Sequence, residues 1–329
     1  MKALQVTSLD GPEGMEVADI EAPTVMSSFY RDAGEPIVVS VRASGVSFPE
    51  VLQARGRYQF KPELPFVPGS EIAGVVESAP AGSRFSKGDR VTAYSFVGGL
   101  AETALVPEHM TFALSEKLSF AEGAALVMNY QTAYFSLVTR GRLQTGDRVL
   151  VQGAAGGVGT ASIQIAKGLG AEVVAIVSDD AKERIAREAG ADHVFRSGEA
   201  WKDETLEALP GGVDIVLDPV GGDRLIDNLR VLREGGRFVI VGFADGEIPQ
   251  IPANRLLLKN IDAVGAMWGG YVLGHPEYAV EAAAAIDELI DSGHVRPIIG
   301  ATFSLDQAAE AFRHIEARKN LGKVVVEIA

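Results

Sequence analysis

Apolar and polar residues between positions 148 and 177 form two short hydrophobic runs with an amphipathic stretch between them. The first run ends at Leu150 and Val151, and a glycine-rich turn over residues 153–159 follows it. Gly170 provides a left-handed helix end, and the second run reaches Val177. The pattern predicts a strand, a turn, a helix and a second strand. The apolar positions of the stretch recur at i, i+3, i+7, i+8 and i+11, on one helix face: Val158, Ala161, Ile165, Ala166 and Leu169.

The turn of this βαβ unit is rich in small residues, so backbone N–H groups can approach a pyrophosphate at the positive end of the helix. The pattern G-x-G-x-x-G would fall on positions 154, 156 and 159, and the first of these is Ala154. The hexamer alone is a weak signal, but its place between two strands and before a helix indicates a dinucleotide-binding unit. The alternative is a generic α/β turn that binds no ligand.

The chain contains two kinds of predicted secondary-structure pattern. Residues 1–118 hold short β-rich runs between glycine and proline turns, at the spacing of a small barrel. Residues 119–266 alternate strands with helices, the pattern of a doubly wound parallel sheet. Residues 267–329 return to a helix, an extended piece, a helix and a last strand, which we expect to complete the first domain. The predicted fold class is therefore α/β, with a dinucleotide-binding domain inserted into a β-barrel domain.

Composition narrows the classes of function. The 329 residues suffice for about two domains, and a formal net charge of −14 argues against nucleic-acid and anionic-lipid partners. The chain has no cysteine, which excludes disulfides, thiolate nucleophiles, iron–sulfur clusters and cysteine-ligated zinc. The N-terminus lacks an apolar signal core, and no run approaches the roughly 18 apolar residues that span a bilayer. We predict a cytoplasmic protein without nucleic-acid or membrane partners.

The end of the second strand decides how an adenosine ribose is held. Asp179 and Asp180 lie where an NAD enzyme places an acid for the ribose 2′-OH. However, Asp180 and Glu183 have the spacing of a capping box, which explains these acids as the start of a helix. Ser178 and Lys182 suit a 2′-phosphate, so the prediction is NADPH rather than NADH. A solvated surface lysine is the alternative for Lys182.

Five segments carry a resemblance to a known family: PFVPGSEIAGVV (65–76), VMNYQTAYFSL (127–137), GAAGGVGTASIQIAK (153–167), DPVGG (218–222) and GRFVIVGFADG (236–246). In this order they are similar to the zinc-independent quinone reductases of the medium-chain dehydrogenase/reductase superfamily, the zeta-crystallin-like group. The resemblance runs nearly from end to end. It implies a Rossmann domain inserted into a GroES-like catalytic domain, an active-site cleft between them, and commonly a homodimer that joins two sheets edge to edge.

The resemblance also implies that this chain has no metal site. Zinc alcohol dehydrogenases of the superfamily carry cysteine in the segment similar to ASGVSFPEV and histidine in a GHE triplet, where this chain has Ser47 and Ser70. The lobe with four structural cysteines is missing as well. This disfavours oxidation of a zinc-bound alkoxide and favours hydride delivery to a quinone or an enone. The five histidines are scattered without paired-ligand spacing: His109, His193, His275, His294 and His314.

On the substrate side, quinone reductases of this kind carry an asparagine and two tyrosines. The matching positions here are Ser47, Leu52 and Tyr58, so one tyrosine is retained. Ser47 is expected to hydrogen-bond a carbonyl oxygen or the nicotinamide, and Tyr58 to donate to a developing oxyanion or enolate. The alternatives are a loop hydroxyl bonded to its own backbone and an aromatic ring that fills the barrel. Leu52 leaves room for an apolar enone or an enoyl thioester.

The cofactor contacts that the resemblance implies lie in five segments. Thr132 resembles the residue near the nicotinamide, and Arg318 resembles a basic residue that meets the 2′-phosphate. For Arg318 the alternative is a charge that complements the helix dipole. The remaining positions are the pyrophosphate turn and the loops after the fourth and fifth strands, where a doubly wound sheet binds ligands: Gly156, Gly157, Val158, Val220, Gly221, Gly242, Phe243 and Ala244.

The function predicted on these grounds is NADPH-dependent reduction of quinones or related α,β-unsaturated carbonyls, with Tyr58 and Ser47 orienting a small-molecule acceptor. Water or Tyr58 would supply the proton. One alternative is an enoyl-thioester reductase in which Tyr58 is the proton donor. Another is an NADPH-binding protein with little turnover.

Overall fold

The computed structural model describes residues 1–24, 34–198 and 200–329 of the chain, in two compact units. Unit 1 comprises Met1–Met128, Pro276–Ala283 and Pro297–Ala329, and unit 2 comprises Asn129–His275 and Ala284–Arg296. Unit 2 therefore interrupts unit 1 along the chain, as the sequence predicts for an inserted domain. Within the described residues, no helix is both long enough and apolar enough to cross a membrane.

Unit 1 is built on a seven-stranded sheet with the order β14-β15-β3-β4-β5-β7, in which β6 also pairs with β3. Strand β15 lies antiparallel to β3 and parallel to β14, so the C-terminal segment joins the sheet made by the N-terminal segment. A separate antiparallel pair joins β1 (Lys2–Val6) to β2 (Met15–Asp19). The bounds of the sheet strands are β3 Ile37–Val46, β4 Glu71–Ser78, β5 Arg90–Tyr94, β6 Thr103–Val106, β7 Thr111–Ala113, β14 Ile299–Ser304 and β15 Lys323–Glu327.

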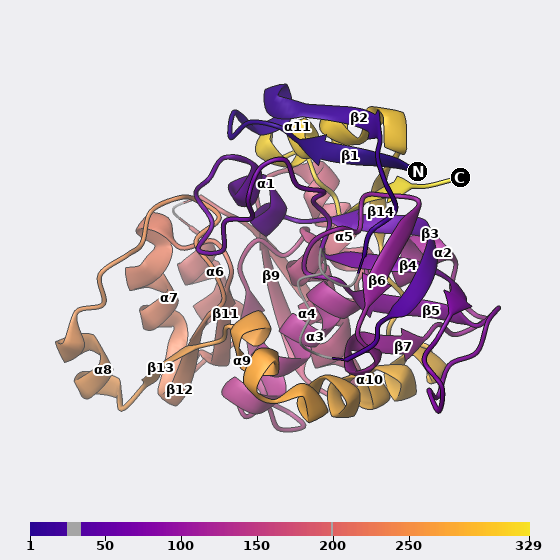
Figure 1. Cartoon of the computed structure of the whole chain (residues 1–329). Helices are drawn as coiled ribbons and strands as arrows, with labels where there is room; N and C mark the ends of the chain where they lie inside the picture. The colour runs from indigo at the N-terminus through magenta and orange to yellow at the C-terminus, as the bar shows by residue number, and fades with distance from the viewer. Residues whose placement is uncertain (25–33, 199) are drawn as a thin grey trace. The chain divides into compact units, whose positions relative to one another are not determined.

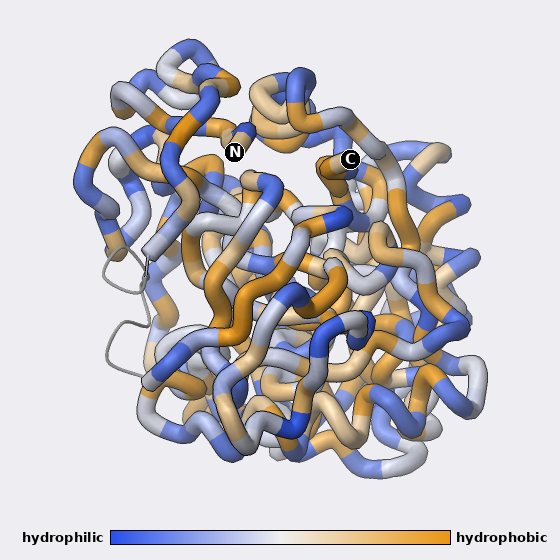
Figure 2. The backbone as a smooth tube through the Cα atoms, turned by 45° about the vertical axis from the view of Figure 1, so that its right-hand side comes forward, coloured by the Kyte–Doolittle hydropathy of each residue, from blue (hydrophilic) through white to orange (hydrophobic). Residues whose placement is uncertain are grey.

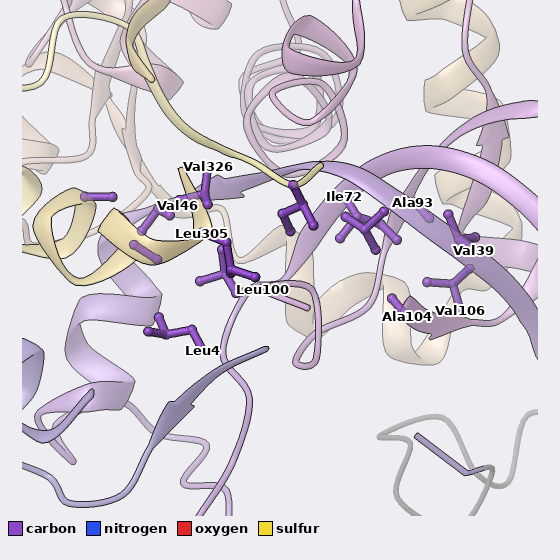
Figure 3. Close-up of a cluster of buried hydrophobic side chains, with 14 of the residues drawn as sticks. Leu4, Val39, Val46, Ile72, Ala93, Leu100, Ala104, Val106, Leu305 and Val326 are labelled. Carbon is purple, nitrogen blue, oxygen red and sulfur yellow. The ribbon is translucent and has the colours of Figure 1, made fainter. Parts of the chain in front are cut away.

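The core of unit 1 follows from residues that alternate along these strands. Ile37, Val39 and Val41 of β3 are at most 1% exposed, while the residues between them are half-buried. Figure 3 shows Val39 and Val46 of β3 in one cluster with Leu4, Ile72, Leu100 and Val326, from segments far apart in the sequence. The helical segments of unit 1 are η1 Gly11–Gly14, α1 Phe48–Ala54, η3 Glu108–Met110, α2 Phe120–Gly123, η6 Leu305–Gln307 and α11 Ala308–Glu316.

Unit 2 contains a six-stranded sheet with the order β10-β9-β8-β11-β12-β13, and every pair in it is parallel. Counted along the chain this order is 3-2-1-4-5-6, which is the Rossmann arrangement. The predicted doubly wound sheet is therefore confirmed, and Figure 1 shows its strands β11, β12 and β13 side by side. The strands are β8 Arg148–Val151, β9 Glu172–Val177, β10 His193–Arg196, β11 Val213–Asp218, β12 Leu232–Ile240 and β13 Asp262–Gly265.

The inner strands of this sheet are rich in apolar residues because a parallel sheet is covered on both faces. All six residues of β11 are buried, and Leu150, Val174 and Phe238 pack in the same core. Figure 2 shows the backbone of the whole chain as hydrophobic segments, in orange, interrupted by hydrophilic segments, in blue. The helical segments are α3 Val127–Tyr134, η4 Phe135–Arg140, α4 Gly157–Gly168, α5 Asp180–Glu188, α6 Trp201–Ala208, η5 Gly222–Arg224, α7 Leu225–Val231, α8 Ala253–Lys259, α9 Trp268–Gly274 and α10 Pro276–Asp291, which contributes to both units.

The compact units differ from the predicted domain limits at two places. Residues 119–128 belong to unit 1, where Thr92 Oγ1 of β5 donates a hydrogen bond of 2.8 Å to the carbonyl of Gly123 in α2. Residues 267–275 and 284–296 belong to unit 2, where Gln164 Nε2 donates to the carbonyl of Arg296 at 2.9 Å. Such contacts join segments that are distant in sequence. The pattern of apolar residues along the chain does not reveal them, so it could not set these two domain limits.

Candidate functional site

The glycine-rich turn lies between β8 and α4 of unit 2. Gly156 is the N-cap of α4, and Gly157 and Val158 form the first turn of this helix, where backbone N–H groups lack intrahelical acceptors. A Cβ on Gly157 would lie 2.2 Å from Asn129 Nδ2, and one on Gly159 would lie 2.4 Å from the carbonyl oxygen of Gly153. Close approach of the backbone thus requires glycine at position 159, whereas a side chain at position 157 would have to displace the amide of Asn129. Backbone N–H groups at the start of a helix are an arrangement that can hold a pyrophosphate.

Helix α3 packs beside this turn and carries Thr132. Asn129, on the same helix, is buried and faces the Cα of Gly157. Tyr130 Oη donates a hydrogen bond of 2.7 Å to Gln164 Oε1 of α4, which holds the two helices together. Thr132 is half-buried on this fixed helix. Asn129 was not selected from the sequence as a candidate site residue. Its position one helical turn before Thr132 is a signal that could have identified it.

The loops after β11 and β12 are joined to one another. Ala244 N donates to the carbonyl of Pro219 at 3.1 Å, and Asp245 N donates to the carbonyl of Val220 at 2.9 Å. A Cβ on Gly221 would lie 3.0 Å from the ring of Phe243. These bonds bring together the predicted positions Val220, Gly221, Gly242, Phe243 and Ala244. They lie beyond the carboxyl ends of parallel strands, where Rossmann sheets bind their ligands.

A buried carboxylate organises the loop after β11. Asp218 Oδ1 accepts hydrogen bonds from Val220 N at 2.8 Å and Gly221 N at 3.1 Å, and Asp218 Oδ2 accepts from Asn228 Nδ2 at 3.1 Å. Burial raises the pKa of Asp218, and these hydrogen bonds oppose the shift. Gln152 Nε2 donates in turn to Asn228 Oδ1 at 2.7 Å. Sequence reasoning missed this network because its members come from three separate segments.

The predicted 2′-phosphate residues meet at the end of β9. Lys182 Nζ donates a hydrogen bond of 2.8 Å to Ser178 Oγ, and it lies 3.4 Å from Asp179 Oδ2. The predicted capping box at Asp180 is wrong by one residue, since the N-cap is Asp179, whose carboxylate accepts from Lys182 N at 3.0 Å. The reason is that α5 begins at Asp180 and Glu183 bonds to arginines instead of reaching back. The hydrogen bond from Lys182 N lowers the pKa of Asp179.

Unit 1 contains a buried polar cluster around α1. Glu50 Oε2 accepts from Ser47 N, and Glu50 Oε1 accepts from Ser70 N, both at 3.1 Å. Lys323 Nζ of β15 donates to Ser47 Oγ at 2.6 Å and is ion-paired with Glu71. Burial raises the pKa of Glu50, while the charge of Lys323 and the hydrogen bond from Ser70 oppose that rise. We refer to Ser47, Glu50, Ser70, Glu71 and Lys323 as the barrel cluster.

Tyr58 lies in the bend after α1 and is half-buried. Its backbone N–H donates to the carbonyl of Leu52 at 3.2 Å, so the two positions expected at the acceptor are neighbours. Burial raises the pKa of the Tyr58 phenol, and the negative charge of Glu50 adds to the rise. The phenol is therefore held in its protonated form, in which it can donate a hydrogen bond.

Comparisons with known proteins agree with this geometry. Residues 33–116 match the family described as "Alcohol dehydrogenase GroES-like domain", and residues 157–288 match "Zinc-binding dehydrogenase". The "Quinone oxidoreductase-like protein 2 homolog" of Nematostella vectensis is 41% identical over 294 residues, covering 88% of this chain and 80% of that protein. The chain belongs to the quinone oxidoreductase family of the medium-chain dehydrogenase/reductase superfamily.

Solved structures show the same fold. A probable oxidoreductase from Mycobacterium abscessus is 41% identical, with a TM-score of 0.89 over 99% of this chain and 98% of that one. The quinone oxidoreductase from Thermus thermophilus, also solved with NADPH, is 33% identical, with a TM-score of 0.82 over 99% and 100%. The predicted GroES-like and Rossmann architecture is therefore confirmed. This member of the quinone oxidoreductase family is an oxidoreductase that uses a nicotinamide cofactor.

The barrel cluster does not fit a catalytic zinc. Ser47 and Ser70 offer hydroxyls in place of the thiolate and imidazole ligands that zinc prefers, and the ammonium of Lys323 lies against Ser47. A second cation beside that ammonium would be repelled. Across residues 1–24, 34–198 and 200–329, no three His, Asp or Glu side chains are grouped to hold a metal ion.

Arg318 lies in unit 1, one residue beyond the C-cap of α11, and has a positive φ of 55°. It is exposed, and its backbone N–H donates to the carbonyl of Ile315 at 2.9 Å. Ser178 and Lys182 belong to unit 2. The role of Arg318 toward a 2′-phosphate therefore stays a prediction.

Proposed function

We propose that this protein reduces quinones or related α,β-unsaturated carbonyls with NADPH and without zinc. The observation that carries the proposal is the contact between Lys323 Nζ and Ser47 Oγ, in the segment where zinc enzymes of the superfamily carry a ligand. An ammonium and a hydroxyl can polarise a carbonyl, but they do not replace a Lewis acid that stabilises an alkoxide. The names of the relatives support a quinone as the acceptor class.

NADPH, when bound, supplies the hydride. The chain's own residues hold the acceptor and its proton. Because Ser47 Oγ accepts a hydrogen bond from Lys323, its own hydroxyl proton is available to donate to an acceptor oxygen. Tyr58, kept protonated by burial and by Glu50, donates to the developing oxyanion or enolate. Either water or Tyr58 completes the reduction with a proton.

The arrangement of unit 2 supports the proposed cofactor contacts. Gly156, Gly157 and Val158 present backbone N–H groups to the pyrophosphate, and the joined loops after β11 and β12 close over the same edge of the sheet. Ser178 and Lys182 hold the 2′-phosphate of NADPH. We assign Thr132 to the nicotinamide end and Arg318 to the 2′-phosphate as further expected contacts.

We further propose a cytoplasmic homodimer formed through β13. This strand is at the end of the sheet order, so one of its edges has no strand beside it within the described part of unit 2. Leu257 and Leu258 of the neighbouring helix α8 are 76% and 74% exposed, and Ile248 is 70% exposed. An unpaired strand edge and exposed apolar side chains both favour association with a second copy.

The experiment that tests the function is the loss of NADPH absorbance with purified, chelator-treated protein and a panel of ortho-quinones, para-quinones and simple enones. NADH is the cofactor control, and an enoyl-CoA is the acceptor control. Turnover of a quinone or an enone with NADPH, unchanged by added zinc, supports the proposal. Turnover of the enoyl-CoA alone would replace it with an enoyl-thioester reductase. NADPH binding without any turnover would contradict the proposed reduction.

A further inference from the structure

Arg196 lies at the corner of unit 2 that holds Ser178 and Lys182. It is the last residue of β10, and its register partner on β9 is Val177, the residue before Ser178. Ser197 N donates to the carbonyl of Val177 at 2.8 Å, which fixes the two strand ends together. The guanidinium of Arg196 and the hydroxyl of Ser178 thus leave adjacent strands at the same edge of the sheet.

The contacts of Arg196 are with acids of α5. Its guanidinium bonds to the carboxylate of Asp180 and, at 2.6 Å, to Glu183 Oε2. The other oxygen of Glu183, Oε1, accepts hydrogen bonds from Arg187 Nε at 3.0 Å and from Arg187 Nη2 at 2.8 Å. The Asp180 side chain is 92% exposed. Arg196 therefore has two carboxylate partners. Asp180 is exposed to water, and Glu183 also binds Arg187.

One nitrogen of Arg196 is not used by these contacts. Its Nη1 atom is buried and has no hydrogen-bond partner in the described part of the chain, although the side chain as a whole is 38% exposed. A buried guanidinium N–H without an acceptor is unfavourable, and a phosphate oxygen is the type of acceptor that a guanidinium matches best. Arg196 thus keeps one nitrogen that its carboxylate partners do not satisfy, and because Nη1 is buried, the guanidinium must turn before a phosphate oxygen can reach that nitrogen.

The charges of the corner balance without a ligand. Lys182, Arg187 and Arg196 carry three positive charges, and three carboxylates oppose them in these contacts: Asp179, Asp180 and Glu183. A 2′-phosphate adds up to two negative charges. One of the three cations must therefore leave its carboxylate partner and bind the phosphate. Arg196 can do so at least cost, since Glu183 keeps Arg187 and Asp180 is already hydrated.

We propose that Arg196 is a third ligand of the 2′-phosphate, and that Asp180 competes with the phosphate for it. This rests on the proposed use of NADPH. Arg196 exchanges its bond to Asp180 for a charge-assisted bond to a phosphate oxygen, while Ser178 and Lys182 bind the other oxygens. The pair Arg196–Asp180 then sets how strongly the protein prefers NADPH to NADH.

The test is calorimetric titration of the full-length protein with NADPH and with NADH, in the absence of any acceptor. Arg196→Gln is expected to weaken NADPH binding about tenfold and to change NADH binding less than about twofold. Asp180→Asn removes the competing charge and is expected to tighten NADPH binding about threefold. Arg184→Gln is the matched control, because it removes an exposed guanidinium from the same helix, and both affinities should stay within about twofold.

An equal loss of NADPH and NADH affinity in Arg196→Gln, or no loss, would overturn the inference. If that variant does not fold, Asp180→Asn decides, because this exposed residue can be changed without disturbing the core: a gain for NADPH alone supports the inference, and no gain overturns it. A wild-type protein that binds both cofactors equally would contradict the assignment of the 2′-phosphate site itself. That outcome is distinct from a wild-type preference that the Arg196 and Asp180 variants leave unchanged.

Discussion

Lys323 Nζ lies 2.6 Å from Ser47 Oγ, and the two residues are 276 positions apart in the sequence. Lys323 opens β15, the last strand of the chain, and Ser47 is the N-cap of α1. The same ammonium is ion-paired with Glu71, whose side chain is fully buried. The contact therefore joins the end of the chain to its beginning through a buried charge.

Replacing Lys323 with Met should destabilise the protein strongly. Removal of the ammonium leaves the carboxylate of Glu71 buried without its partner, and breaking a buried pair on one side costs about 3–5 kcal/mol. The free energy of unfolding in urea measures this cost. The double variant Lys323→Met, Glu71→Gln removes both charges and should recover at least half of the loss. A single variant as stable as the wild type would show that the pair is not a buried ion pair.

The stability of the barrel cluster should depend on pH through Glu50. Because burial raises the folded-state pKa of this carboxyl above its ordinary value of 4.5, the native state holds the Glu50 proton more tightly than the unfolded state. The stability from Glu50 is therefore complete below pH 4.5 and is lost as pH rises through the folded-state pKa. Glu50→Gln cannot titrate, so the difference in unfolding free energy between wild type and variant should move against the wild type as pH rises. A constant difference from about pH 4 to about pH 9 would contradict the shift.

Gly157→Ala should destabilise unit 2 by about 1–3 kcal/mol, since the new methyl group must displace the buried amide of Asn129. Asn129→Ala removes that amide, so in this background Gly157→Ala should cost clearly less. A double-mutant cycle of unfolding free energies gives the coupling. Equal costs of Gly157→Ala in both backgrounds would mean that another contact requires the glycine.

The elements of unit 2 could be predicted from the sequence because each is recorded locally. The apolar runs at Val151 and Val177 and the helical period between them are visible within a short stretch of chain, and β8 and β9 end at these two residues. The N-cap of α5 at Asp179 was missed by one residue, because the cap depends on where β9 ends. The Lys323–Ser47 contact could not be predicted, because it depends on which strands become neighbours in the folded barrel.

Lys182→Ala should weaken NADPH binding about tenfold and NADH binding less than about twofold, because Lys182 Nζ and Ser178 Oγ form the predicted 2′-phosphate pair. Lys167→Ala is a suitable control. This lysine lies in the last turn of α4, also in unit 2, but is ion-paired with Asp192. Fluorescence titration with each cofactor distinguishes the two lysines. Equal losses for NADPH and NADH in Lys182→Ala would remove the assignment.

Tyr58→Phe and Ser47→Ala test the acceptor side separately from the cofactor side. Each change removes one hydroxyl that we assign to the acceptor oxygen, so kcat/KM for a quinone or an enone should fall by about ten- to a hundredfold, with NADPH affinity unchanged.

Ser47→Ala should also lower stability by about 1 kcal/mol through the loss of the N-cap, which thermal unfolding records. Tyr58→Phe keeps the ring, so its thermal unfolding should stay close to that of the wild type. If the wild-type phenol titrated below its ordinary pKa of 10.0 in an ultraviolet difference titration against this variant, burial and Glu50 would not be holding it protonated. Full activity in both variants would show that neither hydroxyl acts on the acceptor.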